Sequence, residues 1–367
     1  MITATDIDRL FDNQLARWEL AQNNYDNLHN AITRQLCEGD SGVWVQHNAG
    51  RITSVSSMAI ANKDSMRPCF LCEQNLPPEQ LRLDFNDEFR VLVNPYPIFQ
   101  RHFTLPTTHH TPQRIASRIA TMLDMAQHLT PYTIFYNGPR CGASAPMHMH
   151  FQAAQKGVIP VERVEMESSM TLLGRHGESR LGLVNDTLRP IFLIQSPHRN
   201  EAEHLFSLLY KALPPIENEE PMMNIIARYD YGQWRMWVFP RAKHRPECYY
   251  ATDESQRLIS PGAVEMGGLF ITPREEDYTR LTWQEIAEAY TDATGINISW
   301  VDEEAYIDSF PTIRTHKEHH WMWYYDRKFN RIIDASKVLS VTGLTRNDFL
   351  SVREGIQAEL DILGWKK

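Results

Sequence analysis

One short stretch of the sequence places two histidines and a glutamine at alternate positions. His148, His150 and Gln152 alternate with the apolar residues Met149 and Phe151. Because successive side chains of a strand point to opposite faces, the pattern predicts a strand with both imidazoles and the amide on one face and the apolar side chains in the core. On such a face one imidazole can act as a nucleophile while its neighbours orient the group that it attacks. The alternative is a pair of solvated or hydrogen-bonded structural histidines.

The His-x-His-x-Gln pattern and the small residues before it, 142–146, resemble the histidine-triad superfamily. Within it they are similar to the branch of galactose-1-phosphate uridylyltransferase, dinucleoside-tetraphosphate phosphorylase and GDP-galactose phosphorylase. The resemblance implies that His150 attacks the α-phosphorus of a nucleotide and forms a covalent nucleotidyl-histidine, which phosphate or a sugar phosphate then accepts. It also implies catalytic roles for His148 and for Gln152, which would contact the non-bridging oxygens of that phosphorus.

Cys69 and Cys72 have the C-x-x-C spacing that lets two thiolates bind one tetrahedral metal or form a redox pair. A redox dithiol normally begins a helix in a βαβ unit, whereas a proline-rich polar loop follows these cysteines. The resemblance implies a structural zinc held by two cysteines, a histidine that precedes a helix, and the first histidine of the pair. The implied ligands are Cys69, Cys72, His148 and one of His109 and His110, with His110 preferred because a Thr-Pro that opens the next helix follows it directly.

The resemblance further implies a set of residues that bind the nucleotide and its phosphates. The residues are Asn137, Ser144, Gly142, Asn94, Arg51, Lys63, Arg241 and Lys243. Glycine lets a backbone approach a phosphate closely, and the planar guanidinium of arginine can bind two phosphate oxygens at once. A turn-forming role is the alternative for the asparagine before Pro95, and solvent exposure is the alternative for the four cations. The resemblance also places the glycine-rich segment 260–268 close to the active centre.

Composition sets outer limits on the protein. A chain of 367 residues is too long for one compact core and suits two domains or two fused halves. Its formal net charge of −9 argues against a nucleic-acid-binding surface. There is no run of about 20 apolar residues to cross a membrane, and the N-terminus lacks the apolar core of a signal peptide. Five cysteines do not suggest a disulfide framework, so we expect a cytoplasmic protein with reduced thiols.

The expected fold class is α+β, with histidine-triad-like antiparallel sheets, flanking helices and two fused halves. The first half is expected to contain helices at 5–35 and 112–128 and a strand at 132–137. A helix at 200–213 and strands at 223–228 and 233–240 repeat the order of helix, strand, turn and strand. The second copy carries Arg235 and Trp237 in place of the two histidines, which predicts a single active site.

The expected division of the chain has three parts. Residues 1–165 form the catalytic half with the zinc site, 166–294 the degenerate half, and 295–367 an extension that packs on the core. The implied activity is that of a nucleotidyltransferase or phosphorylase acting on a nucleoside diphosphate sugar or a dinucleotide, with phosphate or a sugar phosphate as acceptor. A monomer or homodimer without nucleic-acid or membrane partners is expected. A nucleotide hydrolase and a non-catalytic nucleotide-binding protein are the alternatives.

Overall fold

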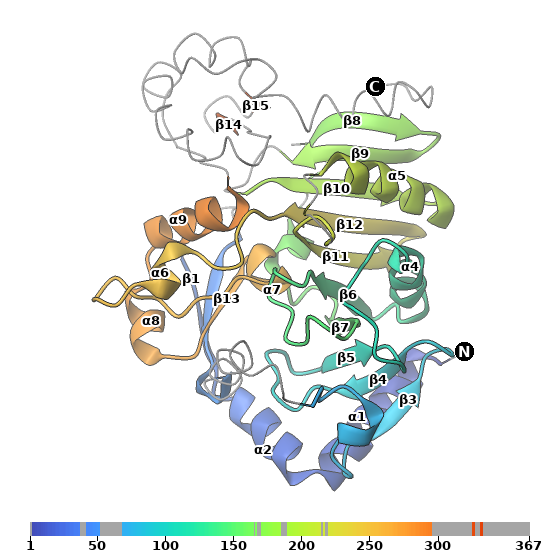
Figure 1. Ribbon diagram of the computed structural model, residues 1–367, viewed down its shortest axis with the longest axis vertical. Helices are drawn as coiled ribbons and strands as arrows, with labels where there is room; N and C mark the ends of the chain where they lie inside the picture. The colour runs from blue at the N-terminus through green and yellow to red at the C-terminus, as the bar shows by residue number, and fades with distance from the viewer. Residues whose placement is uncertain are drawn as a thin grey trace.

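The computed structural model is built around a sheet of ten antiparallel strands (Figure 1). It describes residues 2–36, 42–51, 68–164, 166, 170–184, 189–213, 216, 219–295, 325–326 and 331–332. The strands, in spatial order, are β3 (Arg82–Asp84), β4 (Arg90–Val93), β5 (His102–Pro106), β7 (His150–Gln155), β6 (Tyr132–Asn137), β11 (Met223–Asp230), β12 (Gln233–Pro240), β10 (Ile191–Ser196), β9 (Ser179–Val184) and β8 (Met170–His176).

The order of the strands repeats within the sheet. From one edge it runs β3, β4, β5, β7, β6, and from the other edge β8, β9, β10, β12, β11. In each run a helix follows the third strand: α4 (Ile119–His128) precedes β6, and α5 (Arg199–Ala212) precedes β11. The runs meet where β6 pairs with β11, with Asn137 opposite Asn224. The expected α+β class is confirmed, and the repeated order is what two fused halves predict.

The two faces of the sheet pack into separate cores. Residues Ile134 and Tyr136 of β6 belong to the first core, together with apolar residues of α4, α5, α1 (Ala4–Arg17) and α2 (Glu19–Leu28). Phe135 of the same strand belongs to the second core. There it packs with residues of α7 (Ala263–Met266), β13 (Leu269–Thr272) and α9 (Trp283–Thr294). Gln152 lies opposite Phe135, so the polar face of β7 is turned toward the second core.

The expected helix over 5–35 is wrong. Trp18 has an extended backbone, ends α1 and precedes α2, and this break buries its side chain. Residues Ile32–Gln35 form strand β1, which pairs with β2 (Trp44–His47), and β2 pairs in parallel with β13. Ladder hydrogen bonds to a strand distant in the sequence therefore override the helical pattern.

The expected helix over 112–128 begins only at Ile119. The preceding segment is held by tertiary hydrogen bonds instead, through the side chain of Gln113 and the backbone of Ile115. The other expected strands and the helix at 200–213 agree with β6, β11, β12 and α5 to within two residues.

The domain boundaries at 165 and 294 stay predictions. Of the predicted C-terminal extension the structure describes Gly295 and the two short strands β14 (Tyr325–Asp326) and β15 (Arg331–Ile332). Within the described residues, we find no helix with the length and apolar character needed to span a bilayer.

Glu220 links the two halves of the sheet from a buried position. Its carboxylate accepts hydrogen bonds from the Tyr136 hydroxyl in β6 and from the backbone N–H of Ile115, at 2.7 Å. Only 3% of the residue is exposed. Burial raises the pKa of Glu220 from 4.5 to about 7, although both hydrogen bonds favour the charged form and lower the pKa.

The raised pKa predicts that Glu220 makes folding stability depend on pH. The folded protein holds the Glu220 proton more tightly than the unfolded chain, so this contribution is present below pH 4.5 and is lost as the pH rises to about 7. The loss is about 3 kcal/mol on the scale of 1.36 kcal/mol per pKa unit. We expect Glu220→Gln to remove this component. Urea denaturation of both proteins from pH 4.5 to 7.5 measures it, and parallel pH curves would contradict it.

Candidate active site

His150 begins β7 and is held by hydrogen bonds from both sides of its backbone. Its N–H donates to Oε1 of Gln113, at 2.8 Å. Nε2 of Gln113 in turn donates to the carbonyl oxygens of Asn137 and His150, at 2.8 and 3.0 Å. Gln113 thereby joins the end of β6 to the start of β7. This link fixes the backbone from which the His150 imidazole extends.

The His150 imidazole has one nitrogen hydrogen-bonded and one without a partner. Nδ1 lies 2.8 Å from the carbonyl oxygen of His148. Since a carbonyl only accepts, Nδ1 carries the proton and Nε2 carries the lone pair. Nε2 is buried and has no hydrogen-bond partner in the described part of the chain. The pKa of His150 is lowered to about 4, mainly by burial and also by the nearby His148 side chain, while the hydrogen bond to the His148 carbonyl oxygen opposes the shift. A neutral imidazole with a free lone pair is a nucleophile.

Gln152 is oriented by His102, a residue at the start of β5. Oε1 of Gln152 lies 2.9 Å from Nε2 of His102, whose Nδ1 accepts the backbone N–H of Ile98 at 3.3 Å. His102 therefore carries its proton on Nε2 and donates it to the Gln152 oxygen. The amide group of Gln152 is then left as a donor directed away from His102. The sequence pattern did not indicate His102, because its contact with Gln152 exists only once β5 pairs with β7.

Asn137, at the end of β6, is oriented by residues of the second half. Its Oδ1 accepts hydrogen bonds from Nδ2 of Asn224 at 2.8 Å and from the backbone N–H of Ala263 at 2.7 Å. Oδ1 of Asn224 accepts in turn from a guanidinium nitrogen of Arg241, at 2.7 Å. Both asparagines and Arg241 are at most 8% exposed. Asn224 has no motif around it and becomes evident only from this network.

Arg241 departs from its expected role as a phosphate ligand. Each of its five N–H groups donates to an oxygen of the protein. The acceptors are Ala293 O, Asn224 Oδ1, Pro261 O, Lys243 O and His244 O. No donor is left for a phosphate, so Arg241 supports the Asn137 side chain instead.

The loop that leads to His150 packs against the glycine-rich segment of the second half. Gly142 has a φ of +91°, and a Cβ atom there would lie 3.0 Å from Cα of Gly262. Only glycine allows this backbone conformation and this approach together. Ser144, two residues further along the loop, is exposed. The segment 260–268 therefore lies beside the loop, as the resemblance implied.

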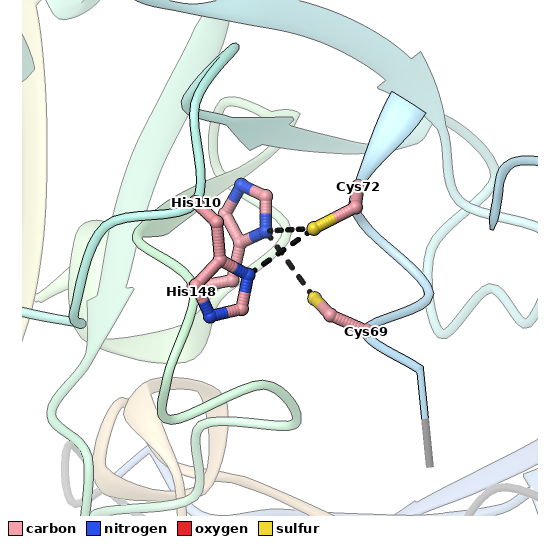
Figure 2. Close-up of side chains that lie close together, drawn as sticks. All are labelled: Cys69, Cys72, His110 and His148. Carbon is pink, nitrogen blue, oxygen red and sulfur yellow. Dashed lines mark hydrogen bonds between the residues drawn. The ribbon is translucent and has the colours of Figure 1, made fainter. Parts of the chain in front are cut away.

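A cluster of two cysteines and two histidines lies next to His150 (Figure 2). One ligand atom from each of Cys69, Cys72, His110 and His148 lies within 4.8 Å of the others. Nδ1 of His148 is 3.2 Å from Sγ of Cys69, and Nδ1 of His110 is 3.1 Å from Sγ of Cys72. Nε2 of His148 lies 2.9 Å from the carbonyl oxygen of Thr107, which fixes the proton there and leaves the Nδ1 lone pair toward the sulfurs. The cluster could hold a metal. Of the two candidate histidines, His109 and His110, it contains His110.

The other residues predicted to bind the nucleotide or its phosphates make different contacts or lie outside the described residues. Asn94 accepts the backbone N–H of Tyr96 at 2.9 Å and donates to Thr104, which is the turn-forming alternative. Lys243 donates to Glu247 at 2.8 Å and has a half-exposed side chain. Arg51 ends the short helix η1 (Ala49–Arg51), but its side chain lies outside the described part. Lys63 also lies outside the described residues.

Comparison with solved structures identifies proteins of similar architecture. The chain matches yeast Ap4A phosphorylase Apa2 in complex with AMP with a TM-score of 0.53 and 18% sequence identity, over 80% of this chain and 97% of the yeast chain. The complex of the same enzyme with Ap4A gives a TM-score of 0.51 and 17% identity, over 78% and 97%. The chain has the histidine-triad-like fold of this phosphorylase.

Sequence comparison adds a family without an assigned activity. Residues 10–155 match the family model described as Domain of unknown function (DUF4922). The chain has no match among curated protein sequences. The matched segment includes β3 to β7, the Cys/His cluster and His150, but it ends before Asn224 and the glycine-rich segment.

The buried network predicts that Arg241 stabilises the fold. Arg241→Met keeps much of the apolar stem but leaves Oδ1 of Asn224 and the carbonyl oxygens of Pro261, Lys243 and His244 without their donor, while the Ala293 oxygen keeps two backbone donors. Unsatisfied buried groups of this kind cost roughly 1–3 kcal/mol each, so we expect a loss of about 3 kcal/mol or more in the free energy of unfolding. Urea denaturation measures the change. Arg280→Met, at an exposed position that ends α8 (Glu275–Arg280), is the control; equal losses in the two variants would contradict the prediction.

Proposed function

We propose that the chain is a nucleotidyltransferase of the phosphorylase type that works through a covalent nucleotidyl-histidine at His150. The observation that carries this proposal is the buried Nε2 of His150, which has no partner while Nδ1 donates to a carbonyl oxygen. A buried nitrogen without a hydrogen bond is costly for a purely structural histidine. It is the arrangement that a nucleophile needs.

The proposed reaction has two displacements at one phosphorus. In the first, the Nε2 lone pair of His150 attacks the α-phosphorus of the donor, and the bond from phosphorus to the leaving phosphate oxygen breaks. The positive charge on the imidazole is stabilised by the Nδ1–H bond to the carbonyl oxygen of His148. In the second, an oxygen of the acceptor attacks the phosphorus and the P–N bond breaks. Ping-pong kinetics and retention of configuration at phosphorus are expected.

Two amides are proposed to stabilise the phosphorus centre. The side-chain oxygens of Gln152 and Asn137 are both engaged with protein donors, which leaves their amide N–H groups to donate. Hydrogen-bond donors fixed in advance near developing negative charge are a major source of acceleration in such sites. Gly142 and Ser144 lie on the loop between them and are proposed to contact the phosphates.

The proposed donors are a dinucleotide or a nucleoside diphosphate sugar, and the proposed acceptor is phosphate or a sugar phosphate. The similar yeast enzyme is an Ap4A phosphorylase whose structures contain AMP and Ap4A, which supports a dinucleoside polyphosphate as the first donor to test. At 18% identity the likeness concerns the fold, so the donor has to be established by experiment.

The covalent step predicts a mass adduct on His150. We expect the protein mixed with Ap4A, GDP-sugars or UDP-sugars, without phosphate, to gain the mass of one nucleotidyl group, which is a nucleoside monophosphate less one water, and His150→Ala to gain none. His128→Ala, which changes an exposed histidine at the end of α4, should behave as the unchanged protein. Intact-mass spectrometry measures the adduct and identifies the base. Turnover without any adduct would contradict the mechanism, and discharge of the adduct by water alone would indicate a hydrolase.

We further propose that the Cys/His cluster holds a structural zinc. Two thiolates and two imidazole nitrogens make the tetrahedral ligand set that Zn²⁺ favours, and both histidines direct Nδ1 toward the sulfurs. When bound, the metal would tie the loop that carries Cys69 and Cys72 to the segment before β7. It would act on His150 only by fixing the position of His148.

Metal analysis tests the zinc proposal. We expect about one zinc per chain, and Cys69→Ser or Cys72→Ser should lose it. Because metal binding adds to folding stability, the melting temperature should fall by roughly 5 °C or more. Cys248→Ser, at a half-buried cysteine outside the cluster, is the control. A protein that holds no metal, or variants that keep it, would contradict the assignment.

A further inference from the structure

Arg245 is a buried arginine that takes part in no ion pair among the described residues. It is 8% exposed, its Nε donates to Oγ of Ser260 at 3.0 Å, and its Cζ lies 4.2 Å from the centre of the Tyr249 ring. Arginine is rarely buried to this extent without a carboxylate. Ser260 thus holds one edge of the guanidinium and Tyr249 covers one of its faces, while its two terminal nitrogens have no acceptor among the described side chains. These nitrogens can bind the oxygens of an anion.

The surroundings of Arg245 are positively charged. His244 precedes it in the sequence, and the carbonyl oxygen of His244 accepts a hydrogen bond from the Arg241 guanidinium at 3.0 Å. Burial lowers the pKa of His244, and the positive charges of Arg245, Arg241 and Arg140 lower it in the same direction. Two carboxylates lie on this side: that of Glu219 is 2.8 Å from Arg140, and that of Glu265 accepts the backbone N–H of Gly262 at 2.8 Å. A neutral imidazole among guanidinium groups can still donate an N–H to an anion.

The group lies next to the loop that leads to His150. Ser260, which holds Arg245, is two residues from Gly262, and the backbone of Gly262 packs against Gly142 of that loop. Arg140 belongs to the same loop, two residues before Gly142. Lys243, although close in sequence, pairs with Glu247 instead. Among the cations of residues 241–245, Arg245 is therefore the one whose guanidinium is held in place and whose terminal nitrogens can still bind an anion.

We propose that Arg245, with His244 beside it in the sequence, forms an anion site that binds the phosphate group of the acceptor. The anion site stands on the contacts of Arg245, while its use by the acceptor rests on the function proposed above. The ligand chemistry is that of a phosphate dianion, which inorganic phosphate and a sugar phosphate share. The planar guanidinium binds two of its oxygens and holds a third toward the nucleotidyl-histidine.

A single-turnover experiment tests the acceptor site. The nucleotidyl adduct is first formed to completion without phosphate, the donor is removed, and discharge is followed by intact mass with inorganic phosphate, with a hexose 1-phosphate, or with water alone. For Arg245→Met we expect the rate of discharge by the true acceptor, relative to that by water, to fall at least about 20-fold. Arg280→Met removes one exposed positive charge from α8 and serves as the control. The unchanged protein shows which of the two acceptors is used.

The outcomes separate this inference from the proposed function. An unchanged ratio in Arg245→Met would overturn the acceptor site while leaving the covalent mechanism in place. If Arg245→Met does not fold, Arg245→Lys decides, since lysine keeps the charge without the planar fork; at least a fivefold fall in the ratio is expected, and no fall overturns the site.

The anion site is tested separately if no donor gives an adduct. Inorganic phosphate should then raise the melting temperature of the unchanged protein, relative to chloride at equal ionic strength, but not that of Arg245→Met or Arg245→Lys. Equal shifts in all three proteins would overturn the anion site itself.

Discussion

The hydrogen bond from Nδ1 of His150 to the carbonyl oxygen of His148 is the interaction on which the site depends. A carbonyl oxygen can only accept, so this one contact decides which nitrogen is protonated and which is available for attack. Its geometry is held from two directions. Gln113 clamps the backbone of His150, and the side chain of His148 is held between Thr107 and the cysteine cluster. The position of the proposed nucleophilic nitrogen thus follows from contacts to the backbone and side chains on either side of it.

The polar groups around His150 are arranged by hydrogen bonds that are buried and mutually satisfied. Asn137 is held by Asn224, which is held by Arg241, and Gln152 is held by His102. In Asn137, Asn224 and Gln152 the amide oxygen accepts a hydrogen bond from the neighbouring donor, so the amide nitrogen points away from that donor. A buried amide that could rotate would present oxygen as easily as nitrogen, and an oxygen would repel a phosphate. The network fixes the sign of the local dipole as well as its position.

The sequence carried the parts of the site that depend on short spacing. The alternation of His148 to Gln152 and the C-x-x-C pair were evident because strand geometry and thiolate chemistry act over a few residues. His102 and Asn224 could not be found this way, since each meets its partner only when distant strands pair. Arg241 illustrates the same limit. Residue type suggested Arg241 for a phosphate, but only its five acceptors show that its donors are already used.

The antiparallel pairing of β6 with β11 gives the site a composite origin. His150 and the cysteine cluster belong to the segment that matches the family model, yet Asn137 in that segment takes its orientation from Asn224 and Ala263, which lie beyond its end at residue 155. The first half is consequently not a self-sufficient module. If the chain were cut after residue 155, Asn137 would lose the donors that orient it, and a second polypeptide would have to supply them across the β6 edge.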